Sequence, residues 1–388
     1  MMFLMSRSAP YYKHNTVCAK EHSMSNTSSS LNGPGTSDNS NAYAIVEQAR
    51  ALGSWRKAGK LWSYMDEDLW GSTAAQISSP VSMRARMTAW IMRLMSSRTD
   101  YPRILAWDLP RDVTAHLAIA YQDDNQRAHY LDVFAPADAG EGKLYPVVID
   151  DHGGGFVYGT RELNRSFAMH LAHRGYVVVV PSYRPGPRWT FVDILTDLSH
   201  AYSWVLEHGA NYGADIDKLF LTGDSAGACM ALHSTQIENS QAMSAQTGVP
   251  QAGLNIRGLL LVCGIYNLKE HFDLHSYAGM LQSICPEVFE SVHDKFVGYD
   301  STTDLLAAAP LPPVFINTSS DDFLHDENVD LAERLEKLGV DYELDDADAK
   351  QWGELGHVSV IGLVTHERSQ ISLDKMDVFM RRVLGNKV

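Results

Sequence analysis

The sequence predicts an α/β fold with a mostly parallel central sheet and helices on both faces. Two observations predict it. After Pro110, short apolar runs alternate with segments of helical length, and this alternation is typical of βαβ units. The runs are also too short and too apolar to be surface helices, so we interpret them as buried strands. Right-handed crossovers between such strands place the connecting helices on both faces of the sheet.

The expected strands follow from the apolar runs. We expect two antiparallel strands at 116–121 and 130–134, and a short strand around 342–344 near the C-terminus. Five further runs predict buried strands at 147–149, 177–180, 219–222, 259–262 and 314–316. Functional residues in a sheet of this kind gather in the loops at the carboxyl ends of its strands, so we searched those loops for chemistry.

The expected helices lie between the strands, at 165–173, 191–208, 226–237 and 326–338, with a final helix at 373–383. An earlier helix around 83–95 carries apolar residues along one face, namely Met83, Met87, Trp90, Ile91, Leu94 and Met95. Another helical pattern runs from 43 to 62, where apolar residues recur at three- and four-residue steps.

Composition and charge exclude several classes of protein. The 388 residues include 47 acidic and 32 basic ones, for a net charge of −15, which is unsuited to binding a phosphate backbone. No apolar run approaches the roughly 18 residues that span a bilayer. The 4 cysteines form no C-x-x-C pair, so we expect neither a disulfide framework nor a thiolate zinc site. The N-terminus does not resemble a signal peptide, and we expect a cytoplasmic location.

A glycine-rich loop follows the expected strand at 147–149. It reads His152, Gly153, Gly154, Gly155 and Phe156. Three consecutive glycines allow backbone geometry that a Cβ atom would forbid, and they leave N–H groups free to point at a ligand oxygen. A nucleotide-phosphate loop is the competing interpretation, but the sequence has neither G-x-G-x-x-G nor a following Gly-Lys-Ser/Thr.

A second loop joins the expected strand at 219–222 to a helix and reads Gly223, Asp224, Ser225, Ala226 and Gly227. This strand–turn–helix context is the one that a nucleophile elbow requires. The turn would expose the Ser225 hydroxyl at the end of the sheet, at a helix N-terminus that favours developing negative charge. We therefore expect Ser225 to be a nucleophile.

A serine nucleophile needs a base, and the chain supplies partners in the order Ser, Asp, His. His357 follows Gly356 in a late loop, and we expect it to take the Ser225 proton. Asp322 is the expected acid that orients His357, with Asp321 as its rival. His152, His325 and His366 also lie near these loops and stay alternatives for the base.

With these motifs in place, the chain resembles the hormone-sensitive-lipase-like esterases of the α/β-hydrolase fold. The resemblance covers roughly residues 112–385 and depends on His152 to Gly155, Gly223 to Gly227, Asp322 to Glu327, and Gly356 with His357. In that family the acid begins an Asp-x-Leu-x-Asp-Glu stretch, which favours Asp322 over Asp321. The family's oxyanion hole would fall on the N–H groups of Gly154, Gly155 and Ala226.

The resemblance also implies a domain organisation. We expect residues 1–41 to be a disordered tail, since they are rich in Ser, Asn, Gly and Thr. Residues 42–110 would form a helical segment that is part of a cap, and 111–388 the catalytic domain, with 267–310 as a candidate second cap piece. The apolar face at 83–95 would then either pack on its own core or form part of a lid.

Two stretches depart from what the motifs suggest. The family commonly has Tyr-Arg-Leu-Ala-Pro-Glu where this chain has Tyr183-Arg184-Pro185-Gly186-Pro187-Arg188, so the final charge is reversed. Residues 341–348 are unusually acidic, and we interpret them as a solvated loop.

The function predicted from the sequence is a serine carboxylic-ester hydrolase that acts on small to medium acyl esters. An amidase or arylformamidase-like hydrolase with the same triad is the first alternative. A non-catalytic ligand-binding homologue is the second, because the gibberellin receptors resemble this family without a complete triad. We expect no metal and no cofactor, no nucleic-acid partner, and a small-molecule ester as substrate. An exposed edge strand near the last helix makes a homodimer a further expectation.

Overall fold

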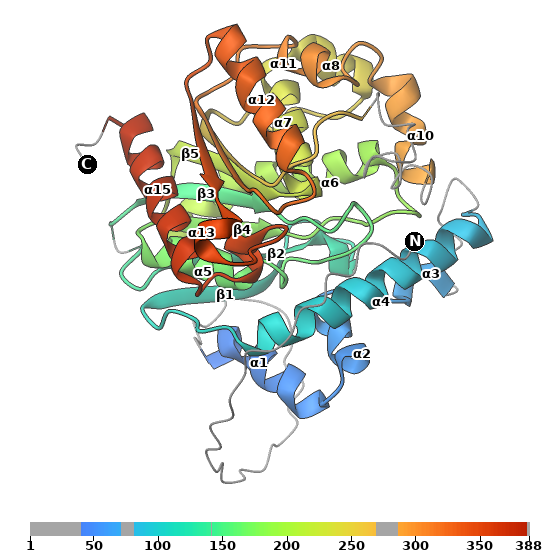
Figure 1. Ribbon diagram of the computed structural model, residues 1–388, viewed down its shortest axis with the longest axis vertical. Coiled ribbons are helices and arrows are strands. Elements are labelled where there is room, and N and C mark those ends of the chain that lie inside the picture. The colour runs from blue at the N-terminus through green and yellow to red at the C-terminus, as the bar shows by residue number, and fades with distance from the viewer. Residues whose placement is uncertain (1–39, 71–80, 141, 269–285, 386–388) are drawn as a thin grey trace. The chain divides into compact units, whose positions relative to one another are not determined.

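The computed structural model describes residues 40–70, 81–140, 142–268 and 286–385 (Figure 1). All of them belong to one compact unit, Thr36–Val388. The expected tail at 1–41 lies outside the described residues except for Ser40 and Asn41, which begin the first helix.

The described residues form one sheet of 8 strands in the order β1-β2-β4-β3-β5-β6-β7-β8. The pairs β1–β2 and β2–β4 are antiparallel and every other pair is parallel, so the predicted fold class is confirmed. The strands are β1 Val113–Ala120, β2 Tyr130–Pro136, β3 Tyr145–Asp151, β4 Val177–Pro181, β5 Ala214–Asp224, β6 Ile256–Val262, β7 Val314–Ser319 and β8 Tyr342–Ala347.

Helices cover both faces of this sheet (Figure 1). One core lies against α6 (Phe191–His208), α7 (Ala226–Asn239) and α12 (His325–Leu338). The other lies against α5 (Arg165–His173) and α15 (Glu367–Val383). Side chains alternate between the two cores along a strand: Val147 and Ile149 of β3 enter the first, and Val148 enters the second.

The helix predictions are confirmed, with differences at the ends. The bounds of α5 and α6 match the prediction, and α6 begins with a capping box between Thr190 and Asp193. The last helix starts six residues earlier than predicted, at Glu367 rather than residue 373. His366 caps it by accepting a hydrogen bond from the Arg368 N–H, a role that the apolar pattern does not show.

The segment expected to be helical at 42–110 consists of α1 (Ser40–Leu52), α2 (Trp55–Ala58), η1 (Gly59–Leu61), α3 (Glu67–Trp70) and α4 (Met83–Leu105). The pattern predicted a helix from 43 to 62, but α1 ends at Leu52. Gly53 follows with φ of +59°, a left-handed conformation that ends the helix.

The face that α4 buries differs from the prediction. Met83, Met87 and Trp90 are 62%, 51% and 38% exposed, so the interpretation that they pack on their own core is wrong. The buried residues of α4 are instead Ala85, Ala89, Arg93, Ser97 and Ile104. The small side chains of Ala85, Ala89 and Ser97 let this helix approach its neighbours closely, while Met83, Met87 and Trp90 lie on its outer side.

Part of the segment at 267–310 is also helical. It contains α10 (Pro286–Lys295) and α11 (Thr302–Leu306), and residues 269–285 lie outside the described part of the chain. Val288, Phe289 and Val292 of α10 are buried in the same core as Phe156 and Phe191. The ring of Phe156 meets the rings of Phe191 and Phe289 edge to face, with centroids 5.6 and 5.4 Å apart.

The acidic stretch at 341–348 is not a solvated loop. Most of it is β8, the last strand of the sheet. Asp345 is buried there and its carboxylate pairs with Arg368 and Lys375. Asp341 pairs with Arg382, so neighbouring cations on α15 stabilise a strand that its charge alone would disfavour.

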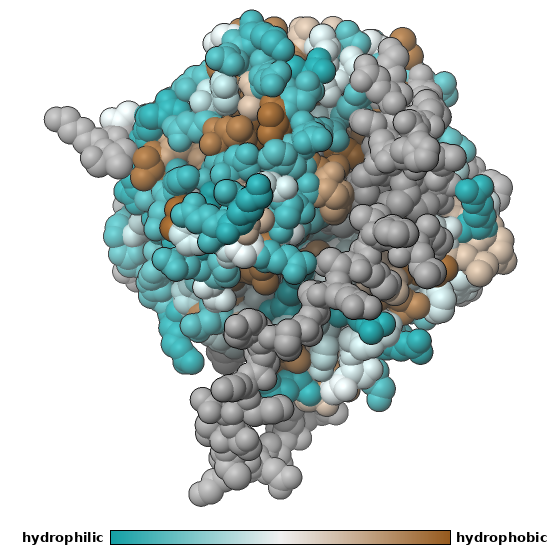
Figure 2. Space-filling view, viewed as in Figure 1, coloured by the Kyte–Doolittle hydropathy of each residue, from teal (hydrophilic) through white to brown (hydrophobic). Residues whose placement is uncertain are grey.

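The described part of the surface is largely hydrophilic in this view (Figure 2). Figure 2 shows hydrophilic residues over much of the described part of this face, with apolar residues in small areas between them. No helix within the described ranges is long and apolar enough to cross a membrane.

Candidate active site

Ser225 lies in the turn between β5 and α7, as predicted. Its φ of 53° and ψ of −117° are unusual for a residue with a side chain, and such strain is common at active sites. The turn is tight enough that a Cβ on Gly223 would overlap the backbone of Gly227, and a Cβ on Gly227 would overlap the Asp151 carbonyl. A side chain therefore does not fit two residues before or two residues after Ser225, at Gly223 and Gly227.

The glycine loop after β3 is attached to this turn. The Gly153 N–H donates a hydrogen bond of 2.9 Å to Oδ1 of Asp224. Gly154 and Gly155 have φ of +117° and +57°. Among the described residues, no hydrogen bond occupies the N–H groups of Gly154, Gly155 or Ala226. Within the described part of the chain, these three donors thus have no acceptor.

His152, the first residue of the glycine loop, helps to fix the conformation of that loop. Its ring stacks on that of Tyr183 with centroids 4.2 Å apart, and the Tyr183 hydroxyl donates to the His152 carbonyl at 2.8 Å. Burial lowers the pKa of His152 to about 4, so the imidazole is neutral near pH 7. Its Nδ1 lies 2.8 Å from the Gly153 carbonyl, which assigns this histidine to the loop rather than to Asp322.

Buried carboxyl groups lie under the same loop, a feature that sequence reasoning missed. The Asn164 amide donates to Asp224 at 2.8 Å and to Asp150 at 3.2 Å, and the Tyr202 hydroxyl donates to Asp151 at 2.6 Å. Burial raises the pKa of all three carboxyl groups, and nearby His357 opposes this rise at Asp224. Two aspartates at the end of an apolar run were the available signal.

His357 and Asp322 are in direct contact. Nδ1 of His357 lies 2.9 Å from Oδ1 of Asp322, and this oxygen also accepts a hydrogen bond of 2.8 Å from the Leu324 N–H. The Asp322 side chain is fully buried, and the His357 side chain is 20% exposed. The pairing leaves Nε2 of His357 available for a second partner.

The rival acid has a different contact. Oδ2 of Asp321 accepts hydrogen bonds of 2.9 Å from the N–H groups of Leu355 and Gly356, the two residues that precede His357. Asp321 therefore fixes the backbone of the histidine loop, while Asp322 contacts the imidazole.

The other histidines near these loops are engaged elsewhere. Nε2 of His325 lies 3.0 Å from an Asp346 oxygen, and His366 caps α15. Ser225, Asp322 and His357 follow β5, β7 and β8, so their loops open at the same edge of the sheet.

Arg93 of α4 joins the N-terminal helices to these loops, and sequence reasoning missed it. Its guanidinium is completely buried and donates to the carbonyls of Val157 at 2.7 Å and Gly186 at 3.0 Å. It also forms an ion pair with Asp68. An arginine inside an otherwise apolar and small-residue helix face was the only available signal.

The Tyr183–Arg188 stretch is tied to α6 by an ion pair. Arg184 forms a bidentate pair with Asp197 of α6, with distances of 2.7 and 2.6 Å. The reversed charge at Arg188 thus leaves this contact in place.

One set of side chains among the described residues could hold a metal ion. It consists of Cys263, Asp322 and His357, whose ligand atoms all lie within 4.8 Å of one another. Two of its members, Asp322 and His357, are already hydrogen-bonded to each other.

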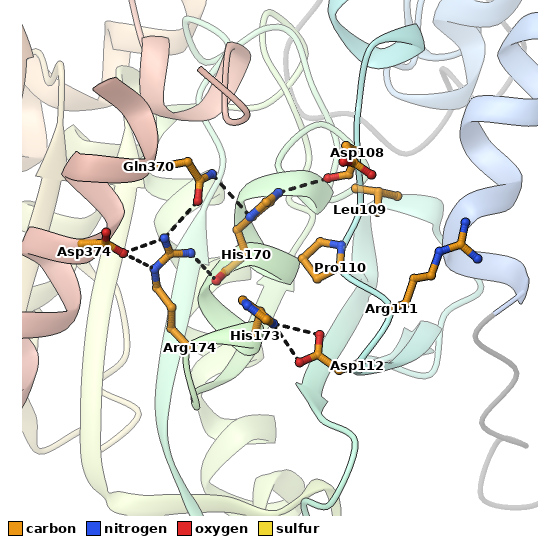
Figure 3. Close-up of a pocket in the computed structure, with 10 residues that line it drawn as sticks. All are labelled: Asp108, Leu109, Pro110, Arg111, Asp112, His170, His173, Arg174, Gln370 and Asp374. Carbon is orange, nitrogen blue, oxygen red and sulfur yellow. Dashed lines mark hydrogen bonds and ion pairs between the residues drawn. The ribbon is translucent and has the colours of Figure 1, made fainter. Parts of the chain in front are cut away.

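A separate pocket of about 450 Å³ lies between α5, α15 and residues 108–112 (Figure 3). Its polar side chains pair with one another: His173 with Asp112 at 2.8 Å, and Arg174 with Asp374 at 2.7 Å. None of the predicted site residues lines it, so we do not assign it to the candidate active site.

Comparison with known proteins agrees with this geometry. A family profile described as alpha/beta hydrolase fold matches residues 148–354. The chain is 28% identical over 234 residues to an isoprenylcysteine alpha-carbonyl methylesterase of Arabidopsis thaliana, which covers 58% of this chain and 54% of that protein. It is 29% identical over 215 residues to Lipase 2 of a Moraxella species, covering 49% and 50%. The chain therefore spans about half the length of these curated relatives.

Solved structures show the same fold. Esterase B from Lactobacillus rhamnosis superposes with a TM-score of 0.71 at 23% identity, over 78% of this chain and 97% of that one. An esterase of the bacterial hormone-sensitive lipase family gives a TM-score of 0.51 at 17% identity, over 88% and 97%. The matched profile covers more than half of the chain and includes the glycine loop, Ser225 and Asp322. The resemblance predicted from the motifs is confirmed, and the chain belongs to the alpha/beta hydrolase fold family.

Proposed function

We propose that this protein is a serine carboxylic-ester hydrolase that acts through an acyl-enzyme on small to medium acyl esters. Ser225 attacks the ester carbonyl carbon while His357 takes the hydroxyl proton at Nε2. The tetrahedral intermediate collapses, His357 returns the proton to the leaving alcohol, and the acyl group stays on Ser225. A water that His357 deprotonates then releases the carboxylic acid and restores Ser225.

The observation that carries the proposal is the hydrogen bond of 2.9 Å between Nδ1 of His357 and the buried Asp322 carboxylate. A buried carboxylate that accepts from Nδ1 holds the imidazole in the tautomer whose Nε2 can act as a base, and it stabilises the imidazolium that forms. The family's nucleophile motif and the names of the curated relatives, which are esterases and lipases, support the ester as substrate class.

The N–H groups of Gly154, Gly155 and Ala226, for which the described residues provide no acceptor, are the donors that we assign to the oxyanion hole. Negative charge develops on the carbonyl oxygen when Ser225 attacks, and preorganised donors stabilise it. One such donor is typically worth about 3–4 kcal/mol of transition-state stabilisation. His152, Gly153, Gly223, Asp224 and Gly227 would hold these donors and Ser225 in place.

The N-terminal helices and the segment that contains α10 are the parts that we assign to a cap. The contacts of Arg93 with residues 157 and 186 support this assignment, because they tie α4 to the loops of the site. A cap in this position would shape the acyl pocket and thereby set the preferred chain length.

The test is hydrolysis of p-nitrophenyl esters of increasing chain length. Ser225→Ala should lower kcat by about 10⁴-fold or more, since it removes the nucleophile. Ser203→Ala is the matched control, because Ser203 lies on α6 and its hydroxyl donates to the Ser199 carbonyl one turn earlier in the same helix. Full activity of Ser225→Ala would show that the proposal is wrong.

The alternatives are outcomes of the same experiment. Faster turnover of a matched aryl amide than of the ester would favour the amidase. Absence of turnover together with failure of a fluorophosphonate to label Ser225 would favour a ligand-binding homologue. The homodimer and the cytoplasmic location stay predictions from the sequence.

A further inference from the structure

Cys263 lies at the centre of the site, although the proposed reaction does not use it. It directly follows β6, which pairs with β5 on one side and β7 on the other. The loops after β5 and β7 carry Ser225 and Asp322. The Cys263 side chain is 1% exposed, so its thiol faces the interior of the protein.

The backbone of Cys263 is held in a strained conformation. Its φ is +48°, in the left-handed region that residues with a Cβ atom seldom adopt. The Cys263 N–H donates a hydrogen bond of 2.8 Å to the Asn317 carbonyl of β7. Strain of this kind persists only where neighbouring structure imposes it, and it gathers at functional sites.

The loop after Cys263 is fixed by α12, the helix that follows the acid. The Gly264 N–H donates to the Asn328 side chain at 2.9 Å, and Asn328 donates back to the Gly264 carbonyl at 3.0 Å. Glu327 accepts the N–H groups of Tyr266 and Asn267 at 2.5 and 2.9 Å. The position of Cys263 relative to Asp322 is thus set by the same helix.

The two oxygens of Asp322 have unequal environments. Oδ1 accepts hydrogen bonds from His357 and from the Leu324 N–H. Oδ2 is buried and, within the described part of the chain, no group meets hydrogen-bond geometry with it. A buried carboxylate oxygen without a donor costs free energy, so a donor within reach is expected to turn toward it.

The Cys263 thiol is such a donor. Its sulfur, an Asp322 carboxylate oxygen and a His357 nitrogen all lie within 4.8 Å of one another. Burial and the negative charge of the neighbouring Asp322 raise the pKa of Cys263 well above its ordinary value. The sulfur therefore keeps its proton at neutral pH and can donate it to an oxygen.

We propose that Cys263 is a positioning residue whose thiol donates a hydrogen bond to Oδ2 of Asp322 and holds that carboxylate for its contact with His357. This proposal rests on the proposed function. A neutral donor suits the position, because a cation there would compete with the imidazolium for the negative charge of Asp322. The thiol acts through Asp322 and touches no substrate.

The test compares Cys263→Ala, which removes the donor, with Cys263→Ser, which keeps one. Cys229→Ala is the control for loss of a buried sulfur, since the Cys229 sulfur lies 3.6 Å from His233 and belongs to no contact of Asp322. For each variant we would measure kcat/KM against pH, the rate of fluorophosphonate labelling of Ser225, and thermal unfolding.

We expect Cys263→Ala to lower kcat/KM and the labelling rate by about three- to tenfold, the size expected for loss of one weak hydrogen bond in the transition state. The acid limb of the pH profile should move upward, because a carboxylate without its donor attracts the imidazolium more strongly. Cys263→Ser should restore both quantities. Cys229→Ala should leave the pH profile in place even if it lowers the melting temperature.

Two results would overturn the proposal. The first is a Cys263→Ala enzyme with the rate and pH profile of the wild type. The second is an equal loss in Cys263→Ser and Cys263→Ala, which would indicate a packing role only. If wild-type Ser225 is labelled normally but no ester is turned over, the proposed substrate class is wrong. The labelling rates of the variants would then still test the positioning role of Cys263. Absence of labelling in the wild type would refute both proposals.

Discussion

Replacement of Arg93 by alanine should destabilise the whole described unit, although the residue lies on an N-terminal helix outside the sheet. Arg93 is completely buried, and its guanidinium contacts four groups. It donates to the carbonyls of Met65 at 3.1 Å, Val157 at 2.7 Å and Gly186 at 3.0 Å, and it pairs with the Asp68 carboxylate.

The expected magnitude follows from these contacts. A hydrogen bond to a charged group contributes about 1.5–3 kcal/mol, and removal of one partner from a buried ion pair typically costs about 3–5 kcal/mol. The Asp68 side chain is only 15% exposed, so water replaces the guanidinium poorly. We therefore expect Arg93→Ala to lower the free energy of unfolding by about 3–5 kcal/mol, a large share of the usual 5–15 kcal/mol.

Urea denaturation followed by tryptophan fluorescence measures this loss. Arg98→Ala is the matched control, because Arg98 lies on the exposed side of the same helix and should change stability by less than about 0.5 kcal/mol. Arg93→Lys should recover only part of the stability, since a single ammonium group cannot reach acceptors on three segments. A loss below about 1 kcal/mol for Arg93→Ala, with an unchanged m-value, would refute the reasoning.

Two further predictions concern acid stability and the histidine loop. Burial lowers the pKa of His233 to about 4, so the native state stays neutral while the unfolded chain takes up a proton below about pH 6.5. The free energy of unfolding should therefore fall by about 1.4 kcal/mol per pH unit on account of His233 as the pH falls from 6.5 to 4. His233→Leu should reduce the slope of unfolding free energy against pH by that amount. Asp321→Ala should lower kcat/KM about tenfold with little change in melting temperature, because the N–H groups before His357 lose their acceptor. Asp321→Asn keeps an acceptor oxygen and should retain most activity, and equal losses in the two variants would contradict this role.

Most of the sheet and the nucleophile turn could be predicted because their signals are local. The buried strands are short runs made mainly of Val, Ile, Leu and Phe, and α6 begins at a capping box between Thr190 and Asp193. The turn at Ser225 needs glycine at positions 223 and 227, so a segment of five residues is enough to predict it.

The face that α4 buries could not be predicted in the same way. An apolar stripe indicates burial only when the partner surface is apolar, and the partners of Arg93 are carbonyl groups of residues 65, 157 and 186. Every residue has a backbone carbonyl group, so the pattern of side chains does not indicate which carbonyls will bind a buried arginine. Asp345 is a similar case, since a buried acid in an edge strand is stable only because Arg368 and Lys375 arrive from α15.

The neighbouring acids Asp321 and Asp322 show where spacing alone fails. Both follow the same strand, and only the resemblance to a known family favoured Asp322. In the structure one carboxylate contacts the imidazole and the other holds the backbone before it. Adjacent residues can direct their side chains to different places, so one carboxylate can contact the imidazole while the other binds the backbone. Asp321 and Asp322 therefore both help to position His357 and are not alternatives for one role.

Carboxylates that accept backbone N–H groups occur at each loop of the candidate site. Asp224 accepts from Gly153, Asp321 from Leu355 and Gly356, Asp322 from Leu324, and Glu327 from Tyr266 and Asn267. An N–H donor stabilises an ionised carboxylate without bringing a positive charge into the site. A chain with a net charge of −15 can therefore fix its loops with acids and still leave His357 as a titratable group able to move a proton beside Ser225. Replacing these acids by arginine-based contacts would place permanent positive charge near that imidazole, which would lower its pKa and weaken it as a base.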